Sequence, residues 1–72
     1  MNTETPNAYY TSRTNELGDV LCVVEAYNDL GQRGWMVCVE ERPEGRKPRR
    51  TPKVWFESRL DALNAALETV SF

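Results

Sequence analysis

The chain has 72 residues, with nine basic and eleven acidic side chains, no histidine and a formal net charge of −2. A chain of this length forms one domain with one small core. It has neither histidine nor a Cys-x-x-Cys pair, so the sequence predicts no zinc site and no cofactor. Because histidine is also the usual general base near neutral pH, the sequence predicts that the protein is not an enzyme.

The compartment follows from what the sequence lacks. No stretch approaches the roughly 20 apolar residues that cross a membrane. Residues 1–13 are polar and lack the apolar region of a secretory signal. The sequence therefore predicts a cytoplasmic protein in which Cys22 and Cys38 are reduced.

The first half of the chain predicts a polar tail followed by two strands. Residues 1–18 are rich in Asn, Thr, Glu and Ser, and we expect a polar N-terminal tail with a short edge strand at 9–11. A single domain is expected at 19–72. The β-branched and aromatic residues of 19–27 and 34–41 predict two strands. The Asn, Asp and Gly residues between them are typical of a turn.

Segment 42–53 departs furthest from ordinary composition. It holds six of the nine basic residues and three of the four prolines. Proline lacks the N–H that a sheet ladder needs and clustered like charges resist packing, so we expect a protruding loop. Residues 1–45 carry eight acidic and three basic side chains, whereas residues 46–72 carry three acidic and six basic ones. The molecule is therefore polarised in charge.

The last segments predict a third strand and a helix. Residues 53–57 are expected to form the strand, and Ser58, with Asp61 three residues later, is expected to cap the helix. Leu60, Leu63, Leu67 and Val70 recur at helical spacing and are expected to face the sheet. The predicted fold class is α+β: a three-stranded antiparallel sheet in β-β-β-α order, with one C-terminal helix packed on one face.

The expected strand pairing assigns each side chain to a face. Pairing Ala26 with Trp35 and Val39 with Phe56 gives an apolar helix-side face of Val20, Cys22, Val24, Ala26, Trp35, Val37, Val39, Val54 and Phe56. Cys22 and Cys38 then lie on opposite faces. Cys38 lies beside Glu57, which disfavours ionisation of its thiol and argues against a nucleophile.

The other face is the predicted protein-binding surface, because it mixes apolar and acidic side chains as interfaces do. It consists of Leu21, Val23, Glu25, Tyr27, Met36, Glu40, Trp55 and Glu57. A small non-enzymatic chain of this kind is expected to be an accessory or regulatory factor, such as a phage or mobile-element inhibitor of a host protein complex. Three alternatives for this face remain. It could form a homodimer, it could be covered by the N-terminal segment with Tyr9 and Tyr10, or its acidic row could mimic a phosphate backbone and occupy the groove of a DNA-binding protein.

The basic segment supplies the alternative function. Arg46, Lys47, Arg49, Arg50 and Lys53 are candidates to contact nucleic acid or an acidic protein patch, or they form a solvated loop. The element order and the run Trp55-Phe56-Glu57-Ser58 resemble the plant AP2-type and integrase arm-type DNA-binding domains over residues 19–70. The resemblance implies that the exposed sheet face reads DNA. The three glutamates expected on that face would repel phosphate, so nucleic-acid binding is the alternative.

Overall fold

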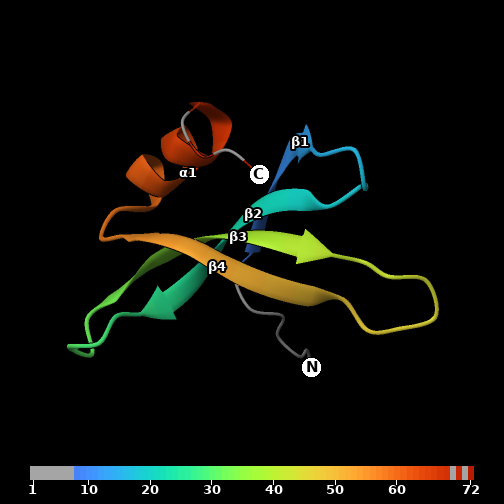
Figure 1. The fold of residues 1–72 in the computed structure, drawn as a ribbon. Coiled ribbons are helices and arrows are strands. Elements are labelled where there is room, and N and C mark those ends of the chain that lie inside the picture. The colour runs from blue at the N-terminus through green and yellow to red at the C-terminus, as the bar shows by residue number, and fades with distance from the viewer. Residues whose placement is uncertain (1–7, 69, 71) are drawn as a thin grey trace, which may run out of the picture.

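A computed structural model describes residues 8–68, 70 and 72. Its elements are β1 (Ala8–Thr14), β2 (Val20–Tyr27), β3 (Arg33–Glu41), β4 (Arg49–Phe56) and α1 (Arg59–Glu68). Each strand pairs antiparallel with the next in the order β1-β2-β3-β4, and α1 lies against one face of the sheet (Figure 1). The α+β class, the antiparallel sheet and the C-terminal helix are confirmed. The expected number of strands was wrong, because the sheet has four and not three.

The additional strand is β1, which was expected only as a short edge strand within a tail. It pairs with β2 through Tyr9 opposite Val23 and Tyr10 opposite Cys22. The Thr11 hydroxyl donates a hydrogen bond to the Leu21 carbonyl oxygen at 2.9 Å. Residues 8–14 thus belong to the sheet, and the part of the predicted tail at 1–7 lies outside the described residues.

The segment predicted as a loop at 42–53 is loop only up to residue 48. Strand β4 begins at Arg49 and ends at Phe56, so it is longer than the strand expected at 53–57. Its register shifts between the pairs Cys38–Pro52 and Val37–Val54, which leaves Lys53 without a partner. Proline, lysine and a bulge are the features that protect an exposed edge strand from pairing with another chain. Residues 49–53, which were predicted as loop, are therefore part of an edge strand.

The pairing of β2 with β3 differs from the predicted pairing by one residue. Trp35 lies opposite Glu25, and Gly34 lies opposite Ala26. A shift of one residue exchanges the two faces of a strand. Leu21 and Val23, which were expected on the outer face, are therefore fully buried in the core.

The core lies between the sheet and α1. It consists of Leu21, Val23, Val37, Val39, Ala62 and Ala66, with Trp35, Phe56, Leu63 and Val70 packed against it. The leucine stripe predicted to face the sheet was wrong in part, because Leu60 and Leu67 are 66% and 52% exposed. The small alanine side chains face the strands instead.

Two arginines attach α1 to the sheet. Arg13 on β1 donates hydrogen bonds to the carbonyl oxygens of Ala66 (2.8 Å) and Val70 (2.7 Å), near the C-terminal end of the helix. Arg59, at the first helical residue, donates to the Tyr9 hydroxyl at 2.7 Å. The Ser58 hydroxyl accepts a hydrogen bond from the Asp61 N–H at 3.4 Å, which confirms the predicted cap.

Candidate functional site: the open sheet face and the basic hairpin

We call the sheet face opposite α1 the open face. By the alternation of side chains along each strand, it carries Tyr10, Cys22, Val24, Ala26, Met36, Cys38, Glu40, Arg50 and Trp55. Among the described elements, the only helix packs on the other side. Three predicted surface residues, Met36, Glu40 and Trp55, lie on this face.

The remaining residues of the predicted acidic surface lie elsewhere. Leu21 and Val23 are in the core. Glu25 alternates with the open-face residues of β2, so it lies on the helix side, where it forms an ion pair with Arg33. Tyr27 lies at the end of β2, and Glu57 follows the last residue of β4. The sheet therefore has no row of three glutamates, and this part of the prediction was wrong.

Glu40, the one glutamate that the described strands place on the open face, is buried and neutralised. Its carboxylate accepts hydrogen bonds from Arg42 Nε (2.7 Å), Arg50 Nε (2.9 Å) and the Tyr10 hydroxyl (2.9 Å). Its side chain is only 3% exposed. Burial alone would raise the pKa of Glu40, but the hydrogen bonds from these three donors outweigh it and the pKa is lowered. Glu40 thus stays ionised and offers no free negative charge.

Tyr10 connects the edge strand β1 to this network. Its hydroxyl donates to Glu40 and accepts a hydrogen bond from Arg50 Nη2 at 3.1 Å. The Arg42 guanidinium lies over its ring, 5.3 Å from the centroid. The ring is nevertheless 49% exposed. From the sequence, Tyr10 was expected only as part of an alternative cover of this face, and Arg42 was given no role; the structure places Tyr10 opposite Cys22 on the open face.

The other half of the open face is apolar. Trp55 and Met36 lie opposite each other on β4 and β3 and are both half-buried. The Trp55 indole N–H donates a hydrogen bond to the Ala26 carbonyl oxygen at 3.1 Å. The indole therefore extends across β3 toward β2 and lies over Gly34.

Residues 42–53, which we call the basic hairpin, carry the excess positive charge. Arg42 and Arg50 bind Glu40, and Arg49 binds Glu41 at 2.7 Å. Arg46, Lys47 and Lys53 are exposed and form no ion pair with the rest of the described chain. Residues 40–53 hold six basic and three acidic side chains, so this end of the sheet has a net charge of +3.

Two shallow hollows flank the basic hairpin. One, of ≈ 370 Å³, is lined by Tyr10, Glu40, Pro48 and Arg50. The other, of ≈ 260 Å³, is lined by Glu41, Pro43, Arg46, Lys47 and Arg49. The open face and the basic hairpin thus form one continuous surface, because Tyr10 and Arg50 belong to the first hollow and also to the open face.

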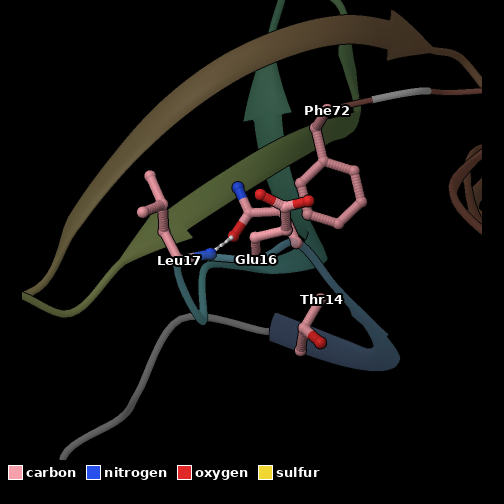
Figure 2. A pocket seen from close by; sticks show the side chains of 5 residues that line it. Thr14, Glu16, Leu17 and Phe72 are labelled. Atoms are coloured by element: carbon pink, nitrogen blue, oxygen red, sulfur yellow. Dashed lines mark hydrogen bonds between the residues drawn. The ribbon is translucent and has the colours of Figure 1, made fainter.

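A larger hollow of ≈ 540 Å³ lies at the β1–β2 turn (Figure 2). Thr14, Asn15, Glu16 and Leu17 line it together with the C-terminal Phe72, and the Leu17 N–H donates to the Asn15 side-chain oxygen at 2.9 Å. Its lining has one carboxylate and no cation, so nothing in it attracts an anionic ligand.

The two cysteines are the remaining candidate reactive groups of the described sheet. Both cysteine thiols are free and buried. Burial, followed by the neighbouring Cys22 thiol, raises the pKa of Cys38 to about 11, which keeps that thiol protonated and weakly nucleophilic. Within residues 8–68, 70 and 72, no three His, Cys, Asp or Glu side chains lie together as metal ligands.

Comparisons with protein-family models, curated proteins and solved structures find no match to this chain. No helix in the described part of the chain is long and apolar enough to cross a membrane.

Proposed function

We propose that this protein is a non-enzymatic nucleic-acid-binding factor whose contact surface is the basic hairpin and the adjoining half of the open face. One observation carries the proposal: a chain with a net charge of −2 places a net +3 at one end of its sheet, with Arg46, Lys47 and Lys53 free of acidic partners in the described structure. Such clustering attracts phosphate groups through release of condensed counterions.

The position of the glutamates supports the same conclusion. A row of three carboxylates across the exposed sheet would repel phosphate. Glu25 instead pairs with Arg33 on the helix side, and Glu40 is buried against Arg42 and Arg50. On the open face of the described sheet, the Glu40 carboxylate is thus neutralised and does not repel phosphate.

An exposed aromatic ring next to the cations supports base contact. Tyr10 is held rigidly by Glu40 and Arg50, and its ring is half exposed beside the ≈ 370 Å³ hollow. Proteins that bind single strands combine cations that follow the backbone with rings on which bases stack. Tyr10 would contact a base through the part of its ring that the Arg42 guanidinium leaves exposed, and Arg46, Lys47 and Lys53 would contact phosphates.

Charge reversal at two ends of the molecule tests the proposal. Lys47→Glu lies in the basic hairpin, and Arg33→Glu lies on β3 next to the β2–β3 turn; each changes the net charge equally. Binding to a labelled mixed-sequence oligonucleotide is measured by fluorescence anisotropy. We expect Lys47→Glu to weaken binding about tenfold, as roughly 1–1.5 kcal/mol per lost contact implies, and Arg33→Glu to change it much less. Equal weakening would refute a hairpin site.

A protein partner on the apolar half of the open face is the second candidate. It is favoured by Met36 and Trp55, which lie side by side on a face that α1 does not cover. In a pull-down from nuclease-treated lysate, a stoichiometric protein that is retained by the wild type and lost with Met36→Asp would favour this candidate. The accessory or regulatory role, including inhibition of a host complex, stays a prediction for either partner.

A further inference from the structure

The two cysteines form a cross-strand pair, contrary to the predicted placement on opposite faces. Cys22 of β2 lies directly opposite Cys38 of β3, and both thiols lie on the open face. The prediction was wrong because the register differs by one residue, which turns Cys22 to the face that Cys38 already occupies. Both residues are buried and both thiols are free.

The geometry of such a pair is close to that of a disulfide. Directly opposed residues in antiparallel strands have Cα atoms about 4.5 or 5.5 Å apart, depending on the pair type. Disulfides span Cα separations of roughly 4.4–6.8 Å. Either pair type therefore falls within the range, and closure needs side-chain rotation with little movement of the backbone. Rotation breaks a weak contact, in which the Cys38 thiol donates to the Met36 carbonyl oxygen at 3.8 Å, and disturbs the side-chain hydrogen bond between Cys22 and Arg50.

We propose that Cys22 and Cys38 are a redox modification site, at which a small peroxide converts the two thiols to an intramolecular disulfide joining β2 to β3. One thiolate attacks a peroxide oxygen, the O–O bond breaks, and a sulfenic acid and one water result after protonation. The second thiol attacks the sulfenic sulfur, the S–S bond forms, and the S–O bond breaks to release a second water. The protein loses two electrons and two protons, and one hydrogen peroxide becomes two waters.

The surroundings determine how fast this step occurs. The desolvated site raises the pKa of both thiols, so little thiolate is present near neutral pH and the reaction is slow. Hydrogen peroxide is small enough to reach a buried pair during local opening, whereas a bulky disulfide reagent is not. The modification therefore has a preferred class of oxidant.

Peptide mapping of the folded full chain tests the proposal. The protein is treated with hydrogen peroxide without denaturant, quenched, alkylated and digested with trypsin without reduction. Cleavage after Arg33 separates the cysteines, and the Arg42–Pro43 bond resists trypsin, so the disulfide joins peptides 14–33 and 34–46. We expect this linked species, a mass lower by two hydrogens, an unchanged monomer fraction, and a higher urea midpoint that dithiothreitol reverses.

Single variants keep the test independent of folding effects. In Cys22→Ala and Cys38→Ala the remaining thiol has no partner, so we expect no loss of two hydrogens and sulfinic acid as the end product. Three outcomes would overturn the proposal: both thiols of the folded wild type stay free after prolonged peroxide, the disulfide forms only between copies, or it forms only in urea. If either variant fails to fold, the wild-type peptide map alone still decides.

Discussion

Trp55 of β4 packs directly on Gly34 of β3, and this contact requires the absence of a side chain at residue 34. A Cβ atom there would overlap the indole ring and lie 2.6 Å from the Phe56 carbonyl oxygen. The indole in turn donates its N–H to the Ala26 carbonyl oxygen at 3.1 Å. Gly34 and Trp55 thus hold three strands together across the open face.

Gly34→Ala is expected to destabilise the protein by about 1–3 kcal/mol, because the new methyl group must displace the indole. Urea unfolding monitored by circular dichroism measures the change. The control is the same substitution in a Trp55→Ala background, where the part of the steric cost due to the indole should vanish and the part due to the Phe56 carbonyl oxygen should remain. If Gly34→Ala costs the same in both backgrounds, the contact with Trp55 is not its cause.

Glu40→Gln is expected to cost about 1–3 kcal/mol, because a buried acceptor of three donors loses its charge. The effect must depend on pH in a definite direction. Because the pKa of Glu40 is lowered in the folded state, its contribution is present above the unfolded value, about 4.3, and is lost as pH falls through the folded value. As the pH is lowered through this range, the urea midpoint of the wild type should decrease. The urea midpoint of Glu40→Gln should decrease less. Parallel curves would contradict the assignment.

The alanine face of α1 predicts an overpacking effect. Ala62 and Ala66 are fully buried against the sheet. Ala62→Leu should push the helix away and cost about 1–3 kcal/mol. Leu67→Ala, a change at an exposed position of the same helix, should alter stability by no more than about 0.5 kcal/mol. Equal effects of the two substitutions on the thermal midpoint would contradict the placement of Ala62 in the core and of Leu67 at the surface.

Removing the Arg13 guanidinium should loosen the end of α1. It donates to the carbonyl oxygens of Ala66 in α1 and of Val70 beyond the helix end, and it lies over the Phe72 ring at 5.5 Å. Arg13→Ala is expected to cost about 1–3 kcal/mol, as for hydrogen bonds from a charged group. Amide hydrogen exchange should then accelerate over residues 62–68 more than over β3. Uniform acceleration would indicate a global effect instead.

The sequence predicted the elements better than their pairing. Residues 20–24 of β2 are apolar at every position, so alternation could not indicate which face is buried, and the register was wrong by one residue. The one-residue error put Leu21 and Val23 on the outer face and Cys22 on the helix side, which is the reverse of the structure. The composition of the expected site was therefore wrong as well. Strand β1 was underestimated because its polar side chains, such as Thr11 and Arg13, find partners only after folding. The charge excess of the basic hairpin could be predicted from composition alone, because it does not depend on how the strands pair.

The most direct test of the central claim is the salt dependence of oligonucleotide binding by the wild-type protein. If Arg46, Lys47 and Lys53 each contact a phosphate, log K should fall linearly with log salt concentration with a slope of about −2 to −3. Between about 50 and 200 mM salt, the affinity should therefore fall roughly 20- to 60-fold. Absence of binding at low salt, or an affinity independent of salt, would contradict the claim.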